Sequence, residues 1–246
     1  MALYTTEAIL LEVRNWGEAD KMLQFFSRDR GRIRAAAFGC RRPKSPLSGA
    51  LQMFNCLEIT LTEGNRVDTV RQASVRQRFP VLTSDLTAMA YASFVAELLL
   101  ELTPEGEPDE KLYGWLPDVF AACGPRNPRL VALAAGYQLL SFAGVGFNLE
   151  ECCRCGRPVE SGGAFSVSEG GALCAACAGE TADNRPYPAS LRDFLLVLAS
   201  LDWRSPASFT AKKDDLMAAE ALLLGGLYHL FGKNLKSLGF IRQLAG

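Results

Sequence analysis

Four cysteines in two closely spaced pairs constrain the fold of this chain more than any other feature of its sequence. Cys152 and Cys155 are separated by two residues, 18 residues follow, and Cys174 and Cys177 repeat the spacing. Each C-x-x-C turn presents two thiolates to one ion, so two facing turns form a tetrahedral zinc site. The spacing predicts one structural Zn²⁺ per chain. Because four thiolates close the coordination sphere, we expect no catalysis there.

Three other interpretations of these cysteines remain: two disulfides, a redox-active C-x-x-C motif, or coincidence. The opening residues MALYTTEAILLEV lack the basic leader and the cleavage site of a secretory signal, which indicates a cytoplasmic protein with reduced thiols. A redox motif normally stands alone near a strand–helix junction. Cys153 is expected to point away from the metal. Cys40, Cys56 and Cys123 are isolated, and we expect them to be buried as small apolar residues.

Charge is distributed unevenly along the chain. Residues 1–80 contain 13 Lys and Arg against 8 Asp and Glu, a net charge of +5, whereas residues 81–246 contain 13 against 19, a net charge of −6. The overall charge of −1 therefore hides a polarised molecule. Nine of the basic residues lie within the first 44 positions. This clustering favours an anionic partner for the N-terminal part.

The first 80 residues show the pattern of a small β-barrel. Short strand-like runs alternate with turn residues, and they cover residues 8–14, 21–27, 32–38, 57–62 and 67–73. Five short strands in this length suit a closed barrel, of which the OB-fold is the commonest nucleic-acid-binding example. The hairpin at residues 60–67 is expected to be tight.

After residue 80 the pattern changes to helices. Ser84 or Asp85 can cap a helix that Pro104 ends, and Pro108, Pro128 and Ser190 open three more. The apolar run at 130–147 is shorter than a membrane span and is interpreted as a buried helix; the last long helix is expected at 214–236. The predicted fold is multi-domain α+β: an N-terminal OB-fold β-barrel (1–80), then an α-helical domain (81–246) carrying a four-cysteine zinc module at about 150–180.

The segment GRIRAAAFGCRRPKS, residues 31–45, suggests how the barrel could bind nucleic acid. On a strand, Arg32, Arg34 and Phe38 share one face. Single strands are bound by cations that follow the phosphates and by rings that stack on bases. The candidate DNA-contacting residues are Lys21, Arg28, Arg30, Arg32, Arg34, Phe38, Arg41, Arg42 and Lys44, with Trp16, Phe25 and Phe26 as further candidate rings. Phe25 is expected to face the core. The alternative is that these arginines only solvate an exposed sheet face.

Signals of an enzyme are weak. There is no G-x-x-x-x-G-K-[ST] motif. The single histidine, His229, lies in a helical run beside Leu and Phe, where a packed role is commoner than a catalytic one. The carboxylates at residues 105–110 are best explained as a solvated connector. We therefore expect a protein that is not an enzyme and has no catalytic residues.

Three longer patterns resemble the RecO family of bacterial DNA-repair recombination mediators. They are GEADKML at 17–23 with GCRRPKSPLSGALQMFN at 39–55, YQLLSFAGVGFNLEECCRCGRP at 137–158, and HLFGKNLKSLGFI at 229–241. The resemblance runs through most of the chain, and the middle pattern is the most specific. It implies an OB-fold, a helical domain behind it and an inserted zinc module that is degenerate in some members, whereas all four ligands are present here.

The resemblance also implies a function. A member of this family binds single- and double-stranded DNA, anneals complementary strands, and works with RecR so that RecA can displace single-strand-binding protein. Such a protein is expected in the cytoplasm, associated with the nucleoid and not with a membrane. A second interpretation is a zinc-stabilised protein-interaction adaptor in which the helical domain is the working surface and DNA contact is secondary.

Overall fold

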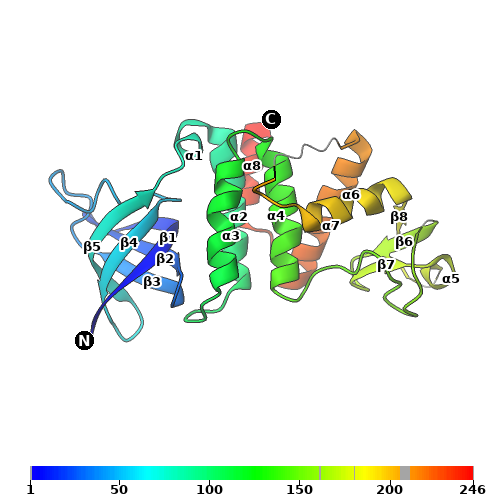
Figure 1. Cartoon of the computed structure of the whole chain (residues 1–246), viewed down its shortest axis with the longest axis horizontal. Coiled ribbons are helices and arrows are strands. Elements are labelled where there is room, and N and C mark those ends of the chain that lie inside the picture. Colours follow the sequence, from blue (N-terminus) through cyan, green and yellow to red (C-terminus); the bar gives the residue numbers. More distant parts are fainter. Residues whose placement is uncertain (1, 161, 180, 206–210, 246) are drawn as a thin grey trace. The chain divides into compact units, whose positions relative to one another are not determined.

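The computed structural model of the chain describes residues 2–160, 162–179, 181–205 and 211–245 (Figure 1). Two compact units are present, Met1–Pro128 with Gly239–Gly246, and Arg129–Leu238. The boundary expected at residue 80 separates the strands from the helices, whereas the compact units divide at Pro128. Residues 161 and 180 of the expected zinc module lie outside the described residues. Among the described helices, none is long and apolar enough to span a membrane.

Five strands of the first unit form a closed barrel in the order β1-β2-β3-β5-β4. Only β3 and β5 pair in parallel, and all other neighbours are antiparallel. The strands are β1 (Leu3–Trp16), β2 (Asp20–Ser27), β3 (Gly31–Ala37), β4 (Cys56–Thr62) and β5 (Asp68–Gln77). All five expected strands are present, and β1 and β5 are longer than expected.

The interior of the barrel is filled by the alternate apolar residues of its strands. Leu23, Phe25, Ala35 and Ile59 are almost or wholly inaccessible and belong to one core cluster. Burying a side chain of the size of Leu or Phe contributes about 1.5–3 kcal/mol. The core position of Phe25 is confirmed. Cys40, also in this cluster, and Cys56 and Cys123 are buried as expected.

Three helices complete the long segment of the first unit: α1 (Val81–Ser84), α2 (Leu86–Leu102) and α3 (Glu110–Ala122). The Asp85 carboxylate caps α2 by accepting from the N–H groups of Thr87 and Ala88. Phe120 on α3 packs against both Phe54 and Phe79, with ring centroids 5.2 and 5.6 Å apart. These contacts join α3 to the β3–β4 segment and to the residues that follow β5.

The loop between α2 and α3 lies directly on the first residues of β3. The N–H of Gly106 donates to the Arg32 carbonyl over 3.2 Å. Gly31 has a φ of +59°, and a Cβ atom there would lie 2.0 Å from the Glu107 carbonyl oxygen. Only glycine permits this approach. The loop expected as a solvated connector is therefore part of the barrel's surface.

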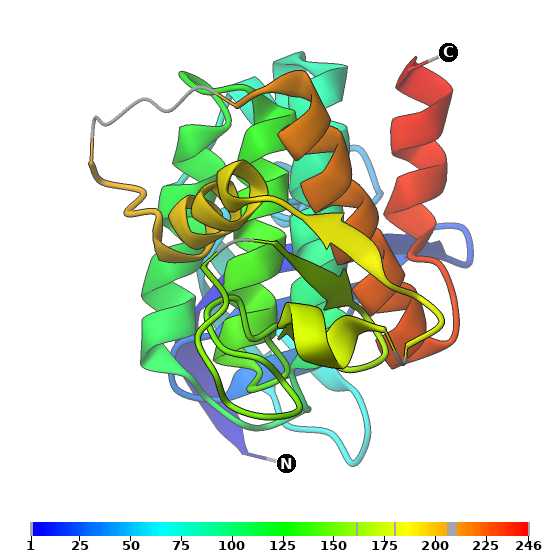
Figure 2. The same ribbon diagram turned by 90° about the vertical axis from the view of Figure 1, so that its right-hand side faces the viewer.

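The second unit combines helices with a small sheet of order β7-β6-β8, which Figure 2 shows with α5 beside it. Its elements are α4 (Pro128–Phe142), β6 (Gly163–Ser166), β7 (Gly171–Leu173), α5 (Ala175–Ala178), β8 (Arg185–Tyr187), α6 (Ala189–Ser200) and α7 (Lys213–Phe231). α4 is buried as expected but ends at Phe142. The helix expected at 214–236 ends early because Gly232 adopts a φ of +65°, and α8 (Lys236–Ala245) follows.

Candidate metal centre and nucleic-acid interface

The four paired cysteines come together at one point. All four Sγ atoms of Cys152, Cys155, Cys174 and Cys177 lie within 4.8 Å of one another. The Sγ atoms of Cys155 and Cys174 are 3.7 Å apart. A tetrahedral site with Zn–S bonds of about 2.3 Å has sulfur–sulfur edges of about 3.8 Å. The cluster thus has the size that a four-thiolate metal site needs.

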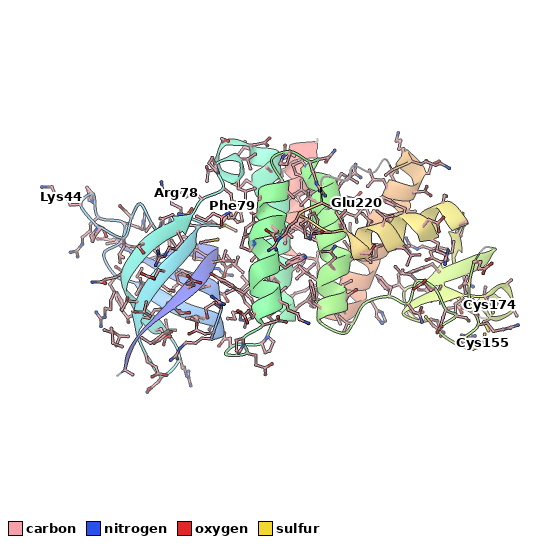
Figure 3. All side chains as sticks on the ribbon, in the orientation of Figure 1. Lys44, Arg78, Phe79, Cys155, Cys174 and Glu220 are labelled. Atoms are coloured by element: carbon pink, nitrogen blue, oxygen red, sulfur yellow. The ribbon has the colours of Figure 1, made fainter. Side chains whose placement is uncertain are left out.

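Backbone hydrogen bonds shape both C-x-x-C turns. In the first turn, the N–H of Gly156 donates to the Cys152 carbonyl over 2.9 Å, and Gly156 has a φ of +70°. In the second, Cys174 directly precedes α5, and the N–H of Cys177 donates to its carbonyl over 2.9 Å. Figure 3 shows Cys155 and Cys174 close together in the part of the second unit that contains β6, β7, α5 and β8, here called the small-sheet module. Cys153 is not a member of the cluster.

The surroundings of the cluster favour thiolates at two positions. Burial opposes ionisation of Cys152, but backbone N–H groups of Cys174, Cys155 and Arg154 outweigh it and lower the pKa of Cys152 to about 6. The Arg157 guanidinium, whose Nε lies 3.3 Å from the sulfur, lowers the pKa of Cys155. These groups stabilise the ionised form that binds metal.

Cys177 behaves in the opposite way, since its hydrogen bond to Cys174 raises its pKa to about 12. Arg157 also reaches Cys174, with Nη2 3.6 Å from its sulfur. Four thiolates around a divalent ion carry a net charge of −2, so a neighbouring cation partly balances the site.

The nine candidate DNA-contacting residues spread over four parts of the barrel. Lys21 is on β2, Arg28 and Arg30 are in the β2–β3 turn, and Arg32 and Arg34 are on β3. The other four lie in the β3–β4 segment, namely Phe38, Arg41, Arg42 and Lys44. Arg30, Arg32 and Arg34 line one cleft, and the nine residues differ in the partners that they contact.

Three of these arginines are paired with carboxylates of the loop before α3 and of α3 itself. Arg28 Nη2 lies 2.5 Å from Glu110 Oε1. Nη2 atoms of Arg32 and Arg34 each lie 3.2 Å from the same oxygen, Oε1 of Glu105. Sequence reasoning missed both carboxylates as partners. Their charges compete with any phosphate for these arginines.

Two further cations have neutral partners. The Arg30 guanidinium lies over the Tyr4 ring, 3.8 Å from its centroid. Lys21 Nζ donates to the Leu51 carbonyl over 3.3 Å. Neither contact neutralises the charge, so both residues can still attract an anion.

Arg41, Arg42 and Lys44 form an exposed basic loop between β3 and β4. Figure 3 shows Lys44 on this loop, which projects from the barrel. Arg41 Nη1 donates to the Gly17 carbonyl over 3.2 Å. Across the described part of the chain, none of the three forms an ion pair with a carboxylate. Unlike Arg28, Arg32 and Arg34, they can attract an anion without displacing an ion-paired carboxylate.

The four candidate rings divide into two pairs. Phe25 and Phe26 are both completely inaccessible, so their candidacy as stacking residues is wrong. Because side chains alternate along a strand, Phe26 lies on the face of β2 opposite to the barrel interior. It is nevertheless buried, and α2 packs against β1 on the outside of the barrel. Trp16 and Phe38 are 49% and 55% exposed.

A further basic residue was missed by sequence reasoning. Arg66 lies in the β4–β5 loop and lines a cleft of about 550 Å³ with Arg30 and Arg34. Asp68 and Glu105 line the same cleft. Parallel pairing of β3 with β5 brings this distant loop to the basic strand. The sequence holds no local signal for that pairing.

His229 is not packed as expected. It lies in the last turn of α7 and is exposed, next to the exposed Tyr228 and Leu230.

Comparison with known proteins identifies the family. Residues 1–79 match the family described as Recombination protein O N terminal, and residues 83–239 match Recombination protein O C terminal. The DNA repair protein RecO of Pelotomaculum thermopropionicum is 37% identical over 203 residues, which cover 82% of this chain and 78% of that protein. DNA repair proteins RecO of Desulforudis audaxviator and Desulforamulus reducens are each 32% identical, covering 99% of this chain and 98% and 96% of theirs. The chain therefore belongs to the RecO family of DNA repair proteins.

Proposed function

We propose that this chain is a non-enzymatic DNA-binding mediator of recombinational repair. It binds single- and double-stranded DNA, anneals complementary strands, and acts with RecR to help RecA load on single strands coated by single-strand-binding protein, in the cytoplasm at the nucleoid. The observation that carries the DNA-binding part is the exposed loop of Arg41, Arg42 and Lys44, whose charges have no carboxylate partner in the described chain.

The barrel is proposed to be an OB-fold. Its order β1-β2-β3-β5-β4, with a single parallel pair between β3 and β5, supports this assignment. OB-folds are five-stranded barrels that bind nucleic acid through positive grooves and exposed rings. The domain proposal remains an OB-fold at 1–80 and a helical domain at 81–246.

Phosphate neutralisation is the proposed basis of both binding and annealing. Two DNA strands repel each other, and cations that shield both lower this repulsion while the bases stay free to pair. The basic loop supplies three such charges, and Lys21, Arg30 and Arg66 can add to them. Arg28, Arg32 and Arg34 contribute only to the extent that phosphate displaces Glu110 and Glu105.

The metal is proposed to be one structural Zn²⁺ per chain, held by Cys152, Cys155, Cys174 and Cys177. Four thiolates at tetrahedral spacing suit zinc or iron–sulfur chemistry, and a closed zinc site serves folding. Its ligands join the loop before β6 to the start of α5, so the metal would staple the small-sheet module.

The decisive experiment is a salt titration of single-stranded DNA binding by fluorescence anisotropy. Each phosphate contact contributes about −0.7 to the slope of log affinity against log salt. Alanine at Arg41, Arg42 and Lys44 should therefore make the slope shallower by about 2.

A matched control removes three arginines that are already ion-paired, by alanine at Arg14, Arg76 and Arg129. Both variants lose three positive charges, and only the loop variant is expected to change the slope strongly. Equal slopes for the loop variant and the unchanged protein would refute the proposed interface.

The alternative function is a protein-interaction adaptor. The observation in its favour is the net charge of −6 over residues 81–246, which suits a basic protein partner. The same loop variant separates the two functions in the full chain. If it loses DNA binding and strand annealing but supports RecA loading normally with RecR, DNA contact is secondary and the adaptor role is the main one.

A further inference from the structure

Two exposed aromatic rings lie side by side at one edge of the barrel. Trp16 ends β1, and Phe38 directly follows β3. Their ring centroids are 5.8 Å apart, with the planes tilted by 51°. About half of each residue is accessible, 49% for Trp16 and 55% for Phe38. Aromatic rings such as Trp are enriched at binding surfaces, so a contact pair of large exposed rings is a candidate binding site.

The fold holds the two rings in place from both sides. Each is followed by a glycine in the left-handed region, Gly17 with a φ of +59° and Gly39 with a φ of +65°, so the chain turns away directly after the ring. β2 lies between the two strands, since Trp16 pairs with Asp20 and Ala37 pairs with Lys21.

Three hydrogen bonds connect the turn after Trp16 and β2 to the segment after Phe38. Asp20 Oδ1 accepts from the N–H of Gly39 over 2.7 Å, and the Ala19 carbonyl accepts from the N–H of Arg41 over 2.9 Å. Arg41 Nη1 also donates to the Gly17 carbonyl over 3.2 Å. The two rings and the start of the basic loop thus form one connected rim, and these hydrogen bonds to β2 and to the turn before it hold the rim in position.

We propose that Trp16 and Phe38 form a stacking platform for an unpaired DNA base. This inference rests on the proposed function and assigns the substrate class of the same interface. An unpaired base exposes its flat face and can stack on aromatic rings whatever its identity. Arg41, Arg42 and Lys44 follow Phe38 within six residues and bind the phosphates next to the stacked base.

The platform makes the interface selective for single strands. Cations of the basic loop attract phosphates of either form of DNA. In a duplex the bases are already stacked and paired, so the rings gain nothing unless a base is first extruded at a cost. The exposed Glu18 in the turn after Trp16 and the half-buried Asp20 are acidic groups of this rim, and Glu18 repels phosphate from the turn itself. The rings thus add affinity to single strands only.

The test measures single-stranded and duplex affinities of full-length protein side by side, using a dT oligonucleotide, a dA oligonucleotide and a duplex of equal length. Replacing one stacking ring by alanine weakens binding of a single strand by about five- to 150-fold. Trp16→Ala and Phe38→Ala should each weaken single-strand binding within this range, leave duplex affinity within about twofold and leave the salt slope unchanged. Trp16→Phe should retain most of the single-strand affinity.

Two controls protect the interpretation. Phe142→Ala removes another half-exposed ring, 48% accessible and far along the sequence, and should change neither affinity. Quenching of Trp16 fluorescence by bound dT oligonucleotide, measured as the signal lost in Trp16→Phe, reports contact without any destabilising change. It also decides the question if the alanine variants fail to fold.

The possible failures are distinguishable. Equal losses of single-strand and duplex affinity, or no loss of either together with no quenching of Trp16, would overturn the platform. If the loop variant of Arg41, Arg42 and Lys44 still shows its shallower salt slope in that case, the proposed function stands and only the stacking role fails.

Discussion

Glu105→Gln should strengthen DNA binding, because this carboxylate occupies the place that a phosphate would take. Its Oε1 atom lies 3.2 Å from Nη2 of both Arg32 and Arg34. The two arginines differ in what the change would release. The Arg32 side chain is only 20% exposed and also donates to the Leu100 carbonyl. The Arg34 side chain is 47% exposed, so we expect only Arg34 to become available.

One released arginine sets the size of the effect. A single new phosphate contact makes the salt slope steeper by about 0.7. If the variant and the unchanged protein bind equally at 1 M salt, the variant should bind about fivefold more tightly at 0.1 M and about threefold more tightly at 0.2 M. Loss of an exposed ion pair costs only about 0.2–1 kcal/mol of folding stability. Binding is therefore expected to change more clearly than the unfolding temperature.

Glu107→Gln is the matched control, because it removes the same charge from the same loop. The Glu107 side chain is exposed and forms no ion pair in the described chain. Anisotropy titrations with single-stranded DNA at four salt concentrations compare the two variants, and Glu105→Gln combined with Arg34→Ala should return the slope to its original value. Equal changes of affinity in the two glutamine variants, or an unchanged salt slope in Glu105→Gln, would show that Glu105 does not compete with phosphate for Arg34.

Two predictions concern the small-sheet module. Cys174→Ser should reduce bound zinc from about one ion per chain and unfold the module, because structural zinc contributes about 10–16 kcal/mol in isolated zinc peptides; Cys153→Ser should retain the metal, as elemental analysis with circular dichroism would show. Burial alone would raise the pKa of Asp183, but hydrogen bonds from Ser166 and Ser168 lower it to about 2. The pKa of an Asp in the unfolded chain is near 4, so a lowered pKa stabilises the fold above that pH, and this stability is lost as the pH falls toward 2. Asp183→Asn should therefore cost about 1 kcal/mol of folding stability at neutral pH, after allowance for solvent screening, and little at pH 2. Thermal unfolding at the two pH values measures the difference.

The metal cluster could be predicted from the sequence because the residues of each cysteine pair are close together in the sequence. Each C-x-x-C turn fixes two sulfurs within a few residues, and only the meeting of the two turns is a tertiary event. The barrel strands were likewise predicted from short alternating runs. The ends of the strands were not predicted, since β1 extends to Leu3 and Trp16 beyond the expected 8–14. Strand pairing with β2 and β4 along this length explains the extension.

The partners of the basic residues could not be predicted. Alternation correctly places Arg32 and Arg34 on one face of β3, but nothing near them in sequence indicates Glu105, which is 73 and 71 positions away. Close approach at Gly31 brings this loop onto the strand. A pattern of cations on a strand therefore shows where charge lies, whereas the fold decides how much of it a ligand can use.

Partial neutralisation of the barrel suits the proposed annealing function, which requires that the paired strands are released. Three phosphate contacts give a salt slope of about −2.1, so affinity falls about 18-fold between 50 and 200 mM salt. Six contacts would give about −4.2 and a fall of about 340-fold, with correspondingly tighter binding at low salt. Pairing of Arg28, Arg32 and Arg34 with Glu110 and Glu105 withholds three contacts, which is the difference between these two cases, whatever Lys21, Arg30 and Arg66 add to the basic loop. Selectivity for single strands then depends on the Trp16–Phe38 rings more than on charge, because the rings distinguish an unpaired base while the cations do not.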